Sequence, residues 1–121
     1  MMRKLSEEDC RACMRDGDFP KAVRSAAPKV AVILTQGWCP QWIRMRGYLE
    51  GAALPPDCAV FAFEYDGTAI FEEFLAFKEG KFGNDQIPYV RYYRSGSLSS
   101  TGNYAGEAEF LSKLGAKPQE A

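Results

Sequence analysis

The 121-residue sequence predicts an α/β fold, in which a central mixed sheet of about four strands is flanked by helices. Val30 to Leu34 is a continuous apolar run typical of a strand that is buried on both faces, and Cys58 to Phe63 is a second apolar run of strand length. A helical pattern follows each run, and this order predicts a parallel part of the sheet. Pro88 to Tyr93 and Leu98 to Thr101 flank Ser95-Gly96, which predicts an antiparallel hairpin.

The first segment of the chain is expected to be a helical extension, residues 1–28, that packs on the main domain. Ser6 has the position of an N-cap, and the acidic residues that follow it face the positive end of a helix dipole. A first helix is therefore expected to run to about Arg15. Glycine and proline interrupt the next stretch, which has room for a short helix around residues 21–26 but shows no strand pattern.

The later helices follow from turn residues and apolar spacing. After the break at Gly37, a proline in the first turn and a stripe of apolar side chains predict a helix from Pro40 to about Glu50. Thr68 is expected to cap a helix that runs to about Lys78. A last helix is expected from about Gly106 to Leu114, with its apolar side chains on one face.

Length and composition indicate one globular domain, because 46% of the residues are hydrophobic and 26% are charged. We expect a main domain over residues 29–115 and a flexible tail over residues 116–121. The net charge of −1 offers no field for a polyanion, and no apolar run is long enough to cross a bilayer. The start of the chain is too polar for a signal peptide. We therefore expect a cytoplasmic protein that has neither nucleic acid nor a membrane as its partner.

Cysteine carries the chemistry that this sequence allows, since it contains four cysteines and no histidine. The lack of histidine excludes a Cys-His pair, a Ser-His-Asp triad and any metal site based on histidine. Cys39 follows a buried strand and precedes a helix, so its sulfur is expected at a helix N-terminus, where free N–H groups favour a thiolate. Ile87-Pro88 precedes the hairpin and is a candidate for a cis peptide bond that turns backbone atoms toward a neighbouring loop.

The order of these motifs resembles the thioredoxin superfamily. The resemblance rests on Trp38-Cys39-Pro40-Gln41-Trp42 after an apolar strand, on Ile87-Pro88 before a hairpin, and on Gly102 before a closing helix. It covers about residues 29–114. It implies a cysteine thiolate that attacks a disulfide, a cis-proline loop that holds the substrate chain, and a second cysteine that resolves the mixed disulfide. Cys39 and Pro88 match the first two roles.

The sequence departs from the pattern of the superfamily in three places. Trp42 occupies the position of the second cysteine, so the reaction cycle cannot be completed within the motif. Cys39-Pro40 is similar to the glutaredoxin Cys-Pro pair, but Gln36 stands where glutaredoxins place a lysine that meets glutathione. Ile33 stands where thioredoxins keep a buried acid for proton transfer. These departures indicate a single-cysteine protein with weak or no dithiol reductase activity.

The resemblance implies a monothiol thiol–disulfide oxidoreductase with Cys39 as its nucleophile. Substrate contacts are expected from Trp38, Pro40, Trp42, Ile87, Pro88 and Tyr89. The substrate would be a protein disulfide, a protein thiol or a small thiol. No cofactor and no metal are expected, and the protein is expected to be a monomer or a weak dimer. Two other interpretations stay open: a noncatalytic binding or adaptor module that uses the same surface, and a peroxidase-like use of Cys39 through a sulfenic acid.

The other cysteines are more simply read as structural. Cys10 and Cys13 have the spacing of a redox pair, but sulfurs three residues apart inside a helix would need backbone distortion to bond. A zinc site is disfavoured because Zn²⁺ needs four ligands. Cys58 lies in an apolar strand and is expected to be a small core residue.

Large and charged side chains near Cys39 allow more than one interpretation. Two interpretations of Trp38 and Trp42 stay open: they belong to the core, or one of them is exposed as a contact surface. Arg44 and Arg46 could favour the thiolate or meet an acidic partner, although a solvated helix face also explains them.

Overall fold

The computed structural model describes residues 2–116 and contains a five-stranded mixed sheet with the strand order β1-β3-β2-β4-β5. Its strands are β1 (Met2–Lys4), β2 (Lys29–Thr35), β3 (Cys58–Glu64), β4 (Tyr89–Arg94) and β5 (Ser97–Gly102). β1 and β2 run parallel to β3, whereas β4 is antiparallel to both β2 and β5. The predicted α/β plan is confirmed. Apart from Ala116, the tail expected over residues 116–121 lies outside the described residues.

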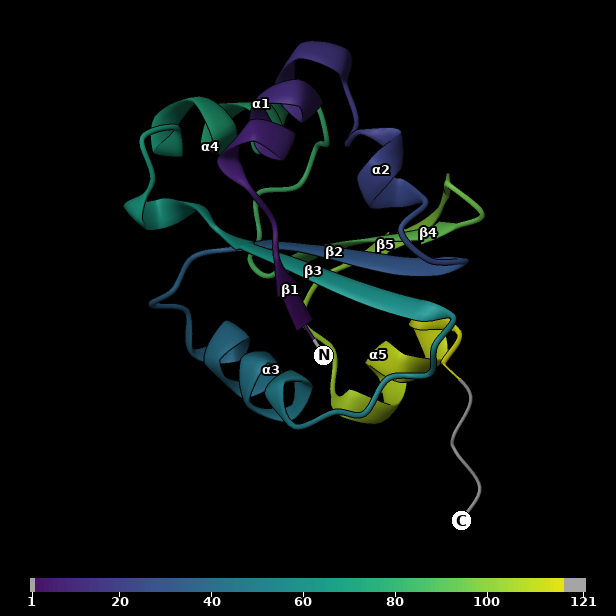
Figure 1. Cartoon of the computed structure of the whole chain (residues 1–121). Coiled ribbons are helices and arrows are strands. Elements are labelled where there is room, and N and C mark those ends of the chain that lie inside the picture. The colour runs from purple at the N-terminus through teal and green to yellow at the C-terminus, as the bar shows by residue number, and fades with distance from the viewer. Residues whose placement is uncertain (1, 117–121) are drawn as a thin grey trace.

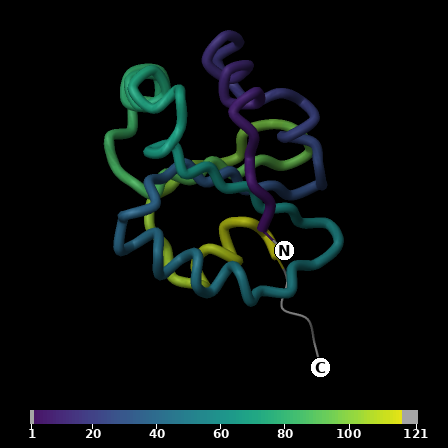
Figure 2. Tube along the Cα trace, turned by 60° about the vertical axis from the view of Figure 1, so that its left-hand side comes forward, coloured from purple at the N-terminus to yellow at the C-terminus, as the bar shows by residue number. Residues whose placement is uncertain are grey.

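Helices cover both faces of the sheet. They are α1 (Glu7–Asp16), α2 (Lys21–Arg24), α3 (Pro40–Glu50), α4 (Phe71–Gly80) and α5 (Glu107–Leu114). α1, α2 and α4 lie on one face, and α3 and α5 lie on the other (Figure 1). The turned view shows the same two helical layers with the sheet between them (Figure 2). Between residues 2 and 116, no helix is both long enough and apolar enough to span a membrane.

The central strand β2 supplies side chains to two separate apolar clusters. Its residues Val30, Val32 and Leu34 pack with α1 and α4, whereas Ala31 and Ile33 pack with α3 and α5. This alternation follows from the two-residue period of a strand. Because both faces are covered, the strand reads as a continuous apolar run in the sequence.

Two elements differ from the sequence expectation. Met2–Lys4 forms a parallel edge strand, in which Met2 pairs with Val60 of β3. Such a short and largely charged strand shows no apolar alternation that a sequence pattern could reveal. The helix expected from Thr68 begins instead at Phe71, since the Thr68 hydroxyl donates to the Tyr65 carbonyl at 2.8 Å and closes a 3₁₀ turn.

A buried polar network fixes the N-terminal segment to the hairpin. The Arg91 guanidinium donates to the hydroxyl groups of Tyr93 and Tyr89 at 2.8 and 3.0 Å. It also pairs with Asp18 at 3.4 Å and lies 3.9 Å above the centre of the Phe82 ring. The Tyr93 hydroxyl in turn donates to Asp18 at 2.5 Å. These contacts satisfy a guanidinium that is almost fully buried, which would otherwise be costly.

Candidate functional site

Cys39 is the N-cap residue of α3, directly after the turn that ends β2. Its backbone N–H donates to the Gln36 carbonyl at 3.2 Å, and its carbonyl accepts from the N–H of Ile43 at 2.9 Å. Pro40 occupies the start of the helix, where its missing N–H costs nothing. The Cys39 side chain therefore lies beside the free N–H groups of the first helical turn, an environment that favours an anion.

The loop that contains Ile87 and Pro88 lies against Cys39. The thiol of Cys39 is 3.8 Å from the carbonyl oxygen of Ile87, in the geometry of a weak S–H···O hydrogen bond. The Ile87-Pro88 peptide bond is cis. Residues 48 positions apart in the chain thus meet at one site.

A buried lysine, which the sequence analysis did not single out, holds this loop from behind. Lys78 has no exposed surface, and its Nζ donates to the carbonyl oxygens of Asn84 at 2.8 Å and Gln86 at 2.7 Å. Burial lowers the pKa of the Lys78 ammonium. The Asn103 side-chain amide donates to the Pro88 carbonyl of the same loop at 3.1 Å.

The two tryptophans of the motif lie in different environments. Trp38 is 63% exposed, and its Nε1 donates to the Gln36 side chain at 2.7 Å. Trp42 is only 1% exposed, and its Nε1 donates to Glu64 at 2.5 Å. The Trp42 indole is part of the core, because α3 packs this face onto the sheet. The expected substrate contact of Trp42 stays a prediction that its burial does not favour.

Arg46 also has a structural partner. Its Nη1 lies 2.9 Å from the same Glu64 oxygen that binds Trp42, and its Nε lies 3.7 Å from Glu50. Arg46 thus adds an ion pair to the Trp42–Glu64 hydrogen bond between α3 and β3. Arg44, by contrast, is exposed on the outer face of α3.

The other residues from which substrate contacts were predicted differ in how exposed they are. Pro40 is exposed and Ile87 is half-buried, so both are within reach of a partner. Pro88 and Tyr89 are buried. The ring of Tyr89 lies 5.7 Å from Lys78 Nζ, and its hydroxyl accepts from Arg91, so its burial does not favour the expected substrate contact, which stays a prediction.

Two carboxylates, Glu64 at the end of β3 and Asp66 in the following turn, lie next to Gly37. The Gly37 N–H donates to Asp66 Oδ1 at 2.9 Å and fixes the turn that leads to Cys39. A hollow of about 670 Å³ with a mixed lining adjoins this turn and includes Lys4, Glu7, Phe63 and Glu64.

The three other cysteines are free and buried. Burial, with a smaller contribution from Asp18 and against an opposing one from Arg91, raises the pKa of Cys13 to about 12. Burial also raises the pKa of Cys10, with a further contribution from Cys13. For Cys58, burial and a contact with Asp57 raise the pKa to about 11. Over residues 2–116, no group of three or more His, Cys, Asp or Glu side chains has an arrangement that could hold a metal ion.

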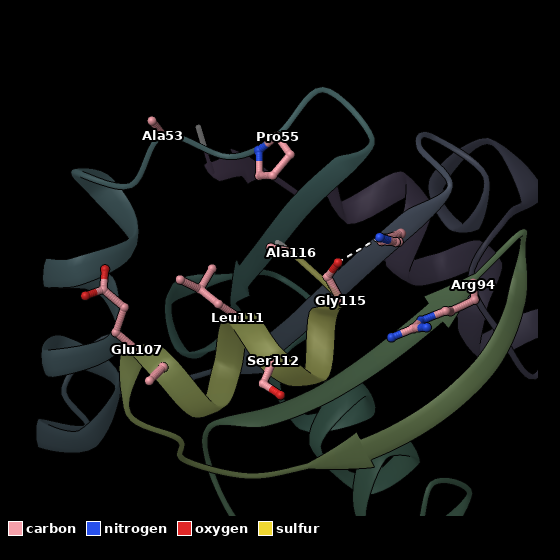
Figure 3. A pocket seen from close by; sticks show the side chains of 10 residues that line it. Ala53, Pro55, Arg94, Glu107, Leu111, Ser112, Gly115 and Ala116 are labelled. Carbon is pink, nitrogen blue, oxygen red and sulfur yellow. Dashed lines mark hydrogen bonds between the residues drawn. The ribbon is translucent and has the colours of Figure 1, made fainter. Parts of the chain in front are cut away.

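A larger hollow lies at the opposite end of the sheet from Cys39 and has a volume of about 840 Å³. Figure 3 shows Ala53 and Pro55 on one side of it and Leu111 of α5 on the other. The Gly115 carbonyl in its wall accepts from Lys29 Nζ at 2.7 Å. A cation therefore already satisfies this end of α5, as is common at a helix C-terminus.

Comparison with known proteins identifies the fold. No protein-family model and no curated protein matches the chain. Thioredoxin F from spinach chloroplast superposes with a TM-score of 0.65 at 13% identity, over 94% of this chain and 90% of that one. Thioredoxin from Plasmodium falciparum gives 0.61 at 15%, over 95% and 96%. Glutaredoxin C1 from Populus tremula x tremuloides gives 0.52 at 18%, over 86% and 96%. At such identities the likeness shows that this chain has the thioredoxin fold.

Proposed function

We propose that this protein takes part in thiol–disulfide exchange by forming mixed disulfides through Cys39. The observation that carries the proposal is the position of Cys39 at the N-terminus of α3, with its sulfur 3.8 Å from the Ile87 carbonyl. A helix N-terminus favours the thiolate, which is the nucleophile in exchange. The thioredoxin fold supports the proposal, because the solved structures that share it include thioredoxins and glutaredoxins.

The reaction is a displacement at sulfur. The Cys39 thiolate attacks one sulfur of a substrate disulfide, a new S–S bond forms, and the substrate's own S–S bond breaks. The other substrate sulfur leaves as a thiolate and takes a proton from water. Because Trp42 stands one helical turn after Cys39, release of the mixed disulfide needs an external thiol, from a small molecule or a protein. That thiol bonds to the substrate sulfur and returns Cys39 to the reduced state.

The surface around Cys39 suits an extended peptide chain. The Ile87 backbone lies beside the sulfur, and an added strand could pair with it through main-chain hydrogen bonds. Trp38, directly before the cysteine in the chain, offers an exposed apolar face. Trp38, Pro40 and Ile87 are therefore the substrate contacts that we propose, with Pro88 fixing the shape of the loop.

A noncatalytic binding module is a second candidate function. Cys39 itself is only 5% exposed, whereas Trp38 is 63% and Ile43 is 47% exposed. Ile43 lies one helical turn after Cys39, so this apolar surface could bind a partner without any sulfur chemistry.

The test uses a small disulfide and a peptide. We expect incubation with dipyridyl disulfide to add one thiopyridyl group to the native wild-type protein, as read by intact mass, and Cys39→Ser to abolish the rapid addition. A peptide that carries a pyridyl disulfide on its cysteine should give a covalent adduct in the same way. If neither reagent modifies Cys39 while the reduced peptide still binds, the binding module replaces the exchange protein as the better description.

A further inference from the structure

Lys78 carries a charge in the interior of the protein without a carboxylate partner. It is fully buried near the end of α4, and no ion pair involves it within residues 2–116. Its hydrogen bonds go to the two backbone carbonyl groups of Asn84 and Gln86. The face of the Tyr89 ring, 5.7 Å away, is a further favourable neighbour for the ammonium.

A buried ammonium is a poor way to gain stability. Taking the charge out of water costs several kcal/mol, and apolar side chains of similar volume are often as good or better at such positions. The role of Lys78 is therefore better explained by the segment that its hydrogen bonds fix in place. Those bonds join α4 to the loop that crosses to β4.

The loop is held at points that surround Ile87. Lys78 binds the carbonyl of Gln86, directly before Ile87, and Asn103 binds the carbonyl of Pro88, directly after it. The side chain of Asn84 stiffens the same segment by accepting from the Gln86 N–H at 3.0 Å. With both neighbouring carbonyl groups occupied, the Ile87 carbonyl is left facing the Cys39 sulfur.

We propose that Lys78 is a positioning residue for the reaction at Cys39, which holds the Ile87 backbone in place to receive an extended peptide disulfide. The inference rests on the proposed exchange function. A small disulfide needs only access to the sulfur, whereas a peptide must also pair with Ile87. Lys78 thus selects for peptide substrates over small ones, and its loss affects the two classes unequally.

The test compares two reagents with the same leaving group, dipyridyl disulfide and a peptide pyridyl disulfide, by the rate of thiopyridone release. We expect Lys78→Met to lower the peptide rate by about tenfold or more relative to the small-reagent rate, because a misplaced binding group costs about this much or more. Lys81→Met removes an exposed charge one turn away and should leave the ratio unchanged. Phe74→Leu, a core change in the same helix, should lower stability but not the ratio.

The ratio of the peptide rate to the small-reagent rate distinguishes a positioning role of Lys78 from a general effect on stability. If Lys78→Met leaves it unchanged, or slows both reagents equally, the proposal is overturned. Lys78→Gln keeps one donor group and serves as the second variant; we expect an intermediate ratio. If the wild type reacts with neither reagent, the exchange function fails, and amide hydrogen exchange at Ile87 then tests Lys78 alone. Faster exchange at Ile87 in Lys78→Met than in Lys81→Met supports the holding of the loop, and equal exchange overturns it.

Discussion

The indole nitrogen of Trp42 donates to the carboxylate of Glu64 at 2.5 Å, across the gap between α3 and β3. The same carboxylate oxygen accepts from Arg46 at 2.9 Å, so the indole is held by a charged pair as well as by packing. Trp42 stands where the thioredoxin pattern has its second cysteine. The side chain at this position is therefore a fixed part of the core, and no thiol stands one helical turn after Cys39.

The first prediction concerns this position. We expect Trp42→Cys to raise the rate of insulin reduction with dithiothreitol above that of the wild type, because a thiol one helical turn after Cys39 can attack the mixed disulfide. Loss of the indole should lower the free energy of unfolding by about 3 kcal/mol or more, since a large buried side chain is removed. Trp42→Ser leaves a similar cavity but no thiol, and is the matched control.

The outcome is read from the two variants together. A gain in Trp42→Cys that is absent in Trp42→Ser supports a missing resolving thiol. Robust insulin reduction by the wild type that survives replacement of Cys10 and Cys13 by alanine would contradict the single-cysteine mechanism.

The second prediction concerns the order in which the four cysteines react. At mildly alkaline pH, iodoacetamide should modify Cys39 in the native protein before any other cysteine, since only Cys39 lies at a helix N-terminus. Cys58 is slightly more exposed, at 8%, but burial and Asp57 raise its pKa to about 11. Peptide mapping by mass spectrometry would locate the label. First modification at Cys58, or modification only on unfolding, would argue against a reactive Cys39.

The fold was predictable because its main elements are marked by apolar runs and turn residues. β2 and β3 are continuous apolar segments, and Ser6 caps α1 as its position predicted, with Oγ accepting from the Asp9 N–H at 3.1 Å. The edge strand Met2–Lys4 was not predictable, since its pairing depends on β3, far away in the sequence. Hydrophobic patterns within a short segment do not show which distant strand it pairs with.

The sequence predicted only those residues of the candidate site whose place in the fold follows from the order of strands and helices. A cysteine between a strand and a helix must lie at a helix N-terminus, so Cys39 could be singled out. Lys78 and Glu64 could not, because each is defined by contacts with another segment: a loop carbonyl in one case and the Trp42 indole in the other. A lysine near a helix end is ordinarily read as solvated.

The third prediction tests how firmly the N-terminal segment is attached to the hairpin. Asp18→Asn should lower the free energy of unfolding by about 2 kcal/mol, because it leaves the buried Arg91 guanidinium without its only anionic partner among the described residues. The control is Asp16→Asn, which breaks an exposed pair with Arg15 and should cost less than about 0.5 kcal/mol. Urea unfolding measures both, and equal effects would contradict a stabilising role for the network.

The last prediction is a loss of stability at alkaline pH that arises in part from Cys13. Burial raises the pKa of this thiol from 9.0 to about 12 in the folded protein. Below pH 9.0 the thiol is protonated in both the folded and the unfolded chain, so its full contribution to stability is present. Above that pH the unfolded chain loses the proton while the folded chain keeps it. The unfolded state then binds fewer protons, and the free energy of unfolding falls as pH rises toward the folded pKa.

Comparison with Cys13→Ala isolates this contribution from those of the buried tyrosines, which both proteins share. Each thiol that ionises only on unfolding lowers the free energy of unfolding by about 1.4 kcal/mol per pH unit. Because the unfolded thiol is only half ionised at the start of the interval, the wild type should lose about 1.6 kcal/mol more than Cys13→Ala between about pH 9 and about pH 10.5. Urea unfolding at these two pH values gives the difference directly. Parallel pH profiles for the two proteins would mean that Cys13 ionises equally in both states, and so that it is not shielded from water in the folded protein.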